Sequence, residues 1–380
     1  MKTTRTVLVI LAIIIILPFL GYLLWIIQKD QPLDLMIVNK SVANVHSNEV
    51  KAFNWVLNYK KIVKSTRSTY DYTRDYYGFF PDPVYEGDYI KSFKLEEIPA
   101  LIEQYDGLIF LDNAGVESKA LGNGKAAFYG GFNQNDYLLL REMYSKNKLI
   151  VAENNFFSEP TEDLVRYNTE QLLDVYYLHW KGKLFKNLDQ KKVEDEIGKK
   201  WIDVYTQTNN SSWDLEGPGL ILLNNKQSRI LVLPQSTYMV SDYPTINTDE
   251  ELASFYSLPL SVPYDGWFQV VYEGKNQVIS YFNLQLNEAG REVLKSGGLD
   301  YIFPATIALN SDHHYFLAGD FSKQDVMLTC SKSRLLSGSL SSFCKLIEGS
   351  PAPFFQNYYV PFMSTILENY LNGKDDQADL

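Results

Sequence analysis

Three short apolar segments of this sequence end in polar side chains that are suited to acid–base chemistry or to hydrogen bonding. They end at Asn39-Lys40, at Asp112-Asn113 and at Glu153-Asn154-Asn155. Ligands of open parallel sheets bind beyond the carboxyl ends of the strands, where neighbouring strands are about 4.8 Å apart. Two carboxylates that close cannot both ionise freely, so the pKa of one of them rises. Such a pair suits general acid–base catalysis or the binding of a hydroxyl-rich ligand.

We predict a ligand-binding site at these strand ends, formed by Asn39, Asp112, Asn113, Glu153, Asn154 and Asn155. The candidates for catalysis are Asp112 and Glu153, with Asp320 or His314 assisting. In a purely structural interpretation, the same polar groups are ordinary caps of the helices that follow. The sequence has neither a CxxC motif nor a Cys/His cluster, so we predict no metal and no cofactor.

The elements around these residues alternate between buried strands and amphipathic helices. Strands are expected at 33–39, 106–112 and 148–153, and helices at 49–63, 135–147 and 161–175, the last one capped by Thr161. This alternation is typical of an α/β fold with a doubly wound, largely parallel sheet. We predict the order 2-1-3-4 at its core, with the three strands as parallel neighbours and 106–112 in the middle. The Tyr-rich segment 70–90 is expected to be a surface loop whose rings could stack on sugars.

The second half of the chain predicts added antiparallel strands. Residues 219–225 and 229–234 flank a polar turn, as the strands of a hairpin do, and 267–286 predicts a second hairpin. A further strand is expected at 314–321, and a last helix at 359–371. We divide the chain into a membrane anchor at 1–30, an α/β domain at 31–240, and a β-rich extension with the C-terminal helix at 241–380, packed on the same domain.

The N-terminal segment predicts one transmembrane helix at about 7–27, an unbroken apolar run between Arg5 and Lys29. A helix of this length spans about 30 Å, the hydrocarbon thickness of a bilayer. A cleavable signal peptide has a shorter apolar core and a small-residue exit, whereas Trp25 suits the aromatic belt of a membrane interface. Lys2 and Arg5 favour a cytoplasmic N-terminus, which places the bulk of the chain outside the cytoplasm.

Composition limits the partners of the chain. A net charge of −11 argues against nucleic acid as a partner, and 46% hydrophobic with 21% charged residues describe a globular protein. The lysines between 181 and 200 alternate with carboxylates and are expected to form a solvated face.

The two cysteines, Cys330 and Cys344, permit a disulfide outside the cytosol. Two buried free thiols are the alternative, and the sequence leaves both open.

Three segments of the chain are similar to motifs of a known family. YDGLIFLDNAG (105–115) is similar to a strand and turn that usually read DGIILPGG, and KLIVAENNF (148–156) to the next strand, which carries the nucleophile in PVLGICLG. Both motifs are those of class I glutamine amidotransferase-like domains, which this chain resembles. Glu153 then stands where that family has its catalytic Cys. FLAGDFSK (316–323) resembles the strand that ends in the family's His-Pro-Glu, with Ser322 about where the His belongs. The resemblance covers roughly residues 33 to 235 plus this last strand.

The departures from the family pattern argue against a glutaminase. Amide hydrolysis there needs a thiolate activated by a His, and Cys330 and Cys344 lie in a C-terminal connector. The resemblance implies a flavodoxin-like fold and a catalytically degenerate domain, of the kind found in uncharacterised membrane-anchored bacterial proteins. We expect a protein of the cell membrane that binds a glycan or an envelope protein in cell-envelope polysaccharide work. Two alternatives stay open: a glycan hydrolase or deacetylase that uses Asp112 and Glu153, and a purely structural scaffold.

Overall fold

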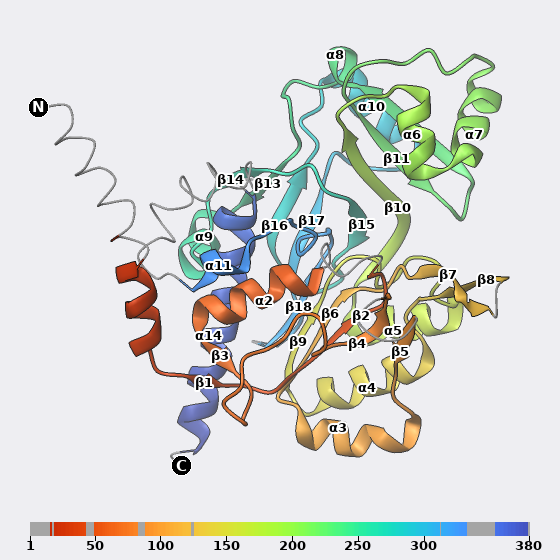
Figure 1. Cartoon of the computed structure of the whole chain (residues 1–380). Helices are drawn as coiled ribbons and strands as arrows, with labels where there is room; N and C mark the ends of the chain where they lie inside the picture. The colour runs from red at the N-terminus through yellow and green to blue at the C-terminus, as the bar shows by residue number, and fades with distance from the viewer. Residues whose placement is uncertain are drawn as a thin grey trace, which may run out of the picture.

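We describe the protein from a computed structural model, in which the described residues are 16, 19–42, 49–82, 88–122, 125–311, 313–332 and 354–378. Their centre is a ten-stranded sheet (Figure 1). In spatial order its strands are β14 (Ser261–Pro263), β13 (Thr245–Thr248), β16 (Gln277–Asn283), β17 (Ile302–Ala308), β18 (His314–Leu317), β9 (Leu149–Ala152), β6 (Gly107–Asp112), β2 (Leu35–Asn39), β4 (Tyr77–Phe80) and β5 (Tyr89–Lys91). Two short pairs accompany it, β1 (Gln31–Pro32) with β3 (Ile62–Val63), and β7 (Val116–Gly122) with β8 (Lys125–Tyr129).

Five consecutive strands of this sheet are parallel, and they confirm the predicted core. β6 lies between β2 and β9, with Gly107 opposite both Leu35 and Leu149. β4 extends the parallel set beyond β2, and β18 extends it beyond β9. Counted along the chain from β2 over the parallel strands alone, the order β4-β2-β6-β9 is 2-1-3-4, as predicted. Every residue of β2, β6 and β9 is buried, as is usual for parallel strands covered on both faces.

The prediction of a surface loop at 70–90 is wrong for part of that segment, because β4 lies within it and pairs with β2. Gly78 has a φ of +137°, and a Cβ there would lie 1.7 Å from the Asn39 carbonyl oxygen. Only glycine therefore allows this close pairing. The Tyr76 ring is buried and stacks on Phe80 at a centroid distance of 4.1 Å. This tyrosine packs the core and is not a platform for sugars.

A second, four-stranded sheet is antiparallel throughout, and its strands are β12 (Arg229–Pro234), β11 (Gly219–Asn224), β10 (Tyr176–Phe185) and β15 (Phe268–Tyr272). The pairing of β11 with β12 confirms the first predicted hairpin. The second predicted hairpin, 267–286, is wrong, because β15 pairs with β10 while β16 pairs with β13 and β17. A turn in the sequence shows that the chain reverses, but it does not determine which neighbours the two strands choose.

Helices cover the parallel strands in two groups (Figure 1). α2 (Glu49–Lys60) contacts β2 and β6 and packs against α14 (Val360–Ala378). α4 (Gln134–Ser145) contacts β6 and β9, with α3 (Ile98–Gln104) and α5 (Asp163–Leu173) beside it. The N-cap of α5 is Glu162. The predicted cap Thr161 is therefore wrong by one residue, and its hydroxyl instead accepts a hydrogen bond from the Phe132 N–H.

A second, smaller core lies under β10, β11 and β12, and consists of Phe185, Leu188, Val193, Trp201, Ile202, Trp213, Ile221, Leu223 and Ile230. α6 (Gln190–Ile197) and α7 (Lys199–Asn209) supply part of it. Figure 1 shows α6 and α7 at the edge of the molecule far from α2 and α14. Further helices are η1 (Leu95–Glu97), α8 (Gln235–Tyr238), α9 (Glu250–Tyr256), α10 (Glu288–Ser296), α11 (Leu328–Ser331) and the π-helical turn η2 (Phe355–Tyr359), which leads into α14.

Residues 19–27 are helical at the start of the described chain. Within the described residues, no helix is both long enough and apolar enough to cross a membrane. Much of the predicted anchor, residues 7–15, 17 and 18, lies outside them, so the membrane span stays a prediction. The Cys330–Cys344 disulfide also stays a prediction, because Cys344 lies outside the described residues.

Candidate functional site

Glu153 directly follows β9, and its side chain is completely buried. The backbone N–H and the hydroxyl of Ser322 donate hydrogen bonds to its Oε2 over 3.0 and 2.6 Å. The hydroxyl of Tyr359 donates to Oε1 over 2.9 Å. The carboxylate therefore joins the ends of β9 and β18 to the turn η2, and solvent does not reach it.

Burial raises the pKa of Glu153 to about 8, although the hydrogen bonds from Ser322 and Tyr359 oppose the rise. The group is therefore mostly protonated at neutral pH. Because a ligand cannot contact this carboxyl, the carboxyl cannot exchange a proton with a ligand. Glu153 is not a helix cap either, because α5 begins only at Asp163. Its contacts are those of a residue that holds the core together.

Asp112 and Asn39, at the ends of β6 and β2, are held by local hydrogen bonds. Asp112 Oδ1 accepts from the Ala114 N–H over 2.7 Å and from Asn155 Nδ2 over 3.1 Å. Asn39 Nδ2 donates to Glu49 Oε2 over 2.7 Å. The strand ends thus converge. Glu49, at the start of α2, lies beside them, although the sequence pattern did not single it out. An acidic residue in the first turn of a helix is so common that it carries little signal.

Three buried carboxylates, Glu49, Asp112 and Asp320, lie at this edge of the sheet. Burial raises the pKa of Glu49 to about 7, and the charge of Asp112 adds to the rise. Burial raises the pKa of Asp320 to about 6; Lys323 opposes the rise and Asp112 adds to it. The sequence predicted that one carboxyl of a close pair at the strand ends would have a raised pKa, and it expected the pair to be Asp112 and Glu153. The main partners are Glu49 and Asp320.

Two more of the predicted binding residues are buried amides. Asn154 Nδ2 donates a hydrogen bond to Asp320 Oδ1, whereas the Asn113 side chain has no hydrogen-bond partner among the described residues. Asn154 is 2% exposed and Asn113 is 0% exposed. Most of the predicted binding residues therefore support the edge of the sheet and do not face solvent.

His314 lies at the other end of the parallel strands, where it is paired with Ile150 at the start of β9. Its ring stacks on Tyr144 at a centroid distance of 4.2 Å. Burial lowers the pKa of His314 to about 4, so the ring is neutral at physiological pH. The structure does not bring it to Asp112 or Glu153, and it belongs to the packing of α4 against β18.

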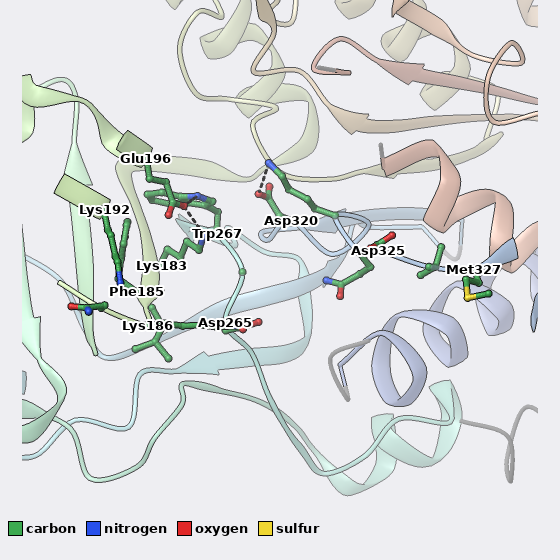
Figure 2. A pocket seen from close by; sticks show the side chains of 16 residues that line it. Lys183, Phe185, Lys186, Lys192, Glu196, Asp265, Trp267, Asp320, Asp325 and Met327 are labelled. Atoms are coloured by element: carbon green, nitrogen blue, oxygen red, sulfur yellow. Dashed lines mark hydrogen bonds and ion pairs between the residues drawn. The ribbon is translucent and has the colours of Figure 1, made fainter. Parts of the chain in front are cut away.

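An open groove of about 880 Å³ begins at Asp320, beside the carboxylates of the strand ends (Figure 2). It lies between the end of β10 with α6 and the segment 320–327 that follows β18, and residues 265–267 complete its lining. Its carboxylates are Glu196, Asp265, Asp320 and Asp325. Its lysines are Lys183, Lys186, Lys192 and Lys323. The groove is therefore polar and close to neutral, in a chain with a net charge of −11.

Trp267 is the aromatic centre of this groove, and it is half-buried. Its indole Nε1 donates to Glu196 Oε1 over 3.2 Å, and Lys183 Nζ lies 2.5 Å from the same oxygen. The ammonium groups of Lys181 and Lys183 are 5.4 and 5.8 Å from the centre of the ring. Figure 2 shows Trp267, Lys183 and Glu196 together on one side of the groove. The ring is thus fixed in place before any ligand arrives.

The sequence did not predict this groove, because its residues come from three separate stretches, 183–196, 265–267 and 320–327. The expectation of a solvated face at 181–200 holds for Lys186 and Lys192, which are exposed and also line the groove, whereas Lys183 is half-buried. Lys181 and Lys183 share one face of β10 because alternate residues of a strand point to the same side. That spacing was the only local signal available.

The two residues that the resemblance placed at the nucleophile and at the His, Glu153 and Ser322, are in direct contact. A carboxyl and a hydroxyl cannot perform thiolate–imidazole chemistry there. Within the described residues, no group of three or more His, Cys, Asp or Glu side chains is placed to hold a metal ion. In comparisons with known proteins, no family model and no curated protein matches this sequence.

Proposed function

We propose that this protein is anchored in the cell membrane and binds a glycan of the cell envelope outside the cytoplasm, through a degenerate amidotransferase-like domain. The glycan would occupy the groove beside Trp267. The observation that carries the proposal is a half-buried indole ring, held by Glu196, in a large groove lined by carboxylates and lysines.

The chemistry of the groove matches that of a sugar. A pyranose ring presents C–H groups that pack on the face of an aromatic ring, and hydroxyls that need hydrogen-bond partners around its edge. Carboxylates accept bonds from those hydroxyls, and lysine ammonium groups donate to their oxygens. Trp267 offers the first kind of contact, while Asp265, Asp320 and Lys323 offer the second.

The charge balance of the groove favours a neutral glycan. Four carboxylates and four lysines line it, so neither an anionic nor a cationic polymer would find a strong field of opposite sign. Lys183 is also paired with Glu196, and Lys323 lies near Asp320, so four of these eight charged groups already have a partner of opposite sign in the groove.

The two alternatives are less favoured by the geometry. A hydrolase that uses Asp112 and Glu153 needs both carboxyls on the substrate, and the side chain of Glu153 is enclosed by Ser322 and Tyr359. A purely structural scaffold would have no use for a groove of about 880 Å³ at the strand ends. Binding without hydrolysis accounts for both observations.

Calorimetric titration of the full chain in detergent tests the proposal. We would titrate two neutral sugars, chitotetraose and cellotetraose, and, as the anionic comparison, the disaccharide of N-acetylglucosamine and N-acetylmuramic acid. Trp267→Ala should weaken binding of the recognised sugar at least about tenfold, since the loss of one aromatic contact with its buried area exceeds about 1.4 kcal/mol. The matched control is Tyr272→Ala. Tyr272 is an aromatic residue at the end of β15, is 54% exposed and lies outside the groove. Equal affinities of the two variants for that sugar would contradict the proposal.

A further inference from the structure

The helix at 19–27 has apolar side chains on several sides, yet one stripe of it packs against the domain. Gly21 and Trp25, one turn apart, are buried. The exposed apolar residues of this segment are Ile16, Phe19, Leu20, Tyr22, Leu23, Ile26 and Ile27. Figure 1 shows the helix beside α2 and α11, at the opposite edge of the molecule from α6 and α7.

Trp25 makes the central contact. Its indole Nε1 donates a 2.7 Å hydrogen bond to the carbonyl oxygen of Asn58, in the last turn of α2. The ammonium groups of Lys61 and Lys332 lie 5.1 and 5.4 Å from the centre of its ring. The sequence suggested an aromatic-belt position for Trp25, in which the ring would face lipid headgroups. The structure places the ring against the protein instead.

Lys61 holds the end of the same helix. Its Nζ donates to the carbonyl oxygens of Ile26 and Gln28 over 2.7 and 2.6 Å, and lies 3.4 Å from Asp30. The carbonyl oxygen of Lys61 then accepts from the Gln31 N–H over 3.0 Å, where β1 pairs with β3. Between Trp25 and Gln31 the chain is therefore tied to the domain at close intervals. A flexible tether would lack such contacts.

We propose that residues 19–30, the end of the predicted anchor, form a docked stalk and not a flexible tether. This stalk holds the neighbouring face of the domain, formed by the end of α2 and by α11, against a lipid bilayer. The bilayer is the occupant because the exposed side chains of the helix are apolar and continue the apolar run of the sequence that starts at residue 7. Lys29 follows this run, and the ammonium of Lys332 lies over the Trp25 ring near its end, so both could meet lipid phosphates there. This inference rests on the membrane anchoring proposed above.

The experiment uses the full chain and has two arms. The first arm is alkaline carbonate extraction of cell membranes that contain the chain. The second arm measures the Tm of the domain by circular dichroism in bilayer nanodiscs of phosphatidylcholine and phosphatidylglycerol. Trp25→Ala should lower the Tm by at least about 3 °C, because the domain loses a packed side chain and its hydrogen bond. Phe19→Ala, which removes an aromatic ring of the same helix that is 62% exposed, should change the Tm by less than about 1 °C. Trp25→Phe, which keeps a ring but loses the donor, should fall between them.

The two arms separate the two proposals. Release of the wild-type chain by carbonate would contradict the anchoring itself, whatever the Tm values. Retention of all variants, with Trp25→Ala melting at the temperature of Phe19→Ala, would overturn the docked stalk and leave the anchoring intact. Retention with a selective loss of Tm in the Trp25 variants supports both.

Discussion

The Tyr359 hydroxyl donates a 2.9 Å hydrogen bond to the Glu153 carboxylate, across 206 residues of sequence. The bond ties the turn before the last helix to the end of β9, in the middle of the parallel strands. The position at which the sequence resemblance places a nucleophile is thus an attachment point for the C-terminal helix. This is why we place ligand binding in the neighbouring groove and not at the strand ends.

The first prediction concerns stability against pH. Folded Glu153 keeps its proton up to about pH 8, whereas an unperturbed glutamate releases it near 4.5. The folded state therefore binds more protons than the unfolded state in this window, and the free energy of unfolding falls as the pH rises through it. The stabilisation is complete below about pH 4.5 and is lost by about pH 8. Glu49, whose pKa is raised to about 7, acts in the same direction.

Glu153→Gln tests this prediction. The amide keeps the shape, its oxygen can accept from Ser322, and its NH₂ can donate to the Tyr359 oxygen. Between pH 6.5 and 8, wild type should lose about 2 kcal/mol more than the variant, from about 1.4 kcal/mol per pH unit. His314 does not interfere, because its lowered pKa acts only below 6.5. Chemical denaturation at four pH values measures the slopes, and parallel slopes would show that Glu153 is not the group responsible.

The second prediction concerns Tyr359→Phe. Removing the hydroxyl takes away one of the donors to a buried carboxyl and should cost about 1 to 3 kcal/mol of unfolding free energy. It should also raise the pKa of Glu153, because the Tyr359 hydrogen bond lowers it, so the pH dependence should extend to higher pH. Tyr358→Phe is the matched control, since this hydroxyl bonds Ser280 and Thr306 and not Glu153. It should lower stability and leave the pH profile unchanged. The same profile in both variants would argue against the Glu153–Tyr359 bond.

The third prediction concerns the pairing of β4 with β2. Gly78→Ala would place a Cβ 1.7 Å from the Asn39 carbonyl oxygen at a φ of +137°, so β4 must separate from β2. We expect a loss of at least about 3 kcal/mol. Gly217→Ala is the control: it also has a positive φ, of +74°, but nothing lies within 4 Å of its Cβ, so about 1 to 2 kcal/mol is expected. Urea denaturation gives both values, and an equal cost would mean that β4 does not approach β2 so closely.

The parallel core could be predicted from sequence because its strands are buried on both faces and read as short apolar runs between helices. The pairing of β15 and β16 could not, because their connecting turn fits a hairpin equally well. β4 was hidden in a segment rich in Tyr, Gly and Pro, where Gly78 marks a close backbone contact instead of a loop.

Part of the candidate site could likewise be predicted from the sequence, and part of it could not. The convergence of Asp112 with other carboxylates follows from the topology and was expected. The coverage of Glu153 by Tyr359 depends on a contact between distant parts of the chain, which no local pattern encodes. The groove depends on how the four-stranded sheet sits beside residues 320–327, and only the assembled structure contains that information.

The most direct test of the central claim observes Trp267 itself during binding. The chain has six tryptophans, so 5-fluorotryptophan labelling gives a fluorine spectrum that can be assigned with Trp267→Phe. Addition of the sugar identified by calorimetry should shift the Trp267 resonance to saturation, and should leave that of Trp213, in the smaller core, in place. A Trp267 resonance that does not move while the sugar is bound would contradict the claim that the groove beside Trp267 is the glycan site.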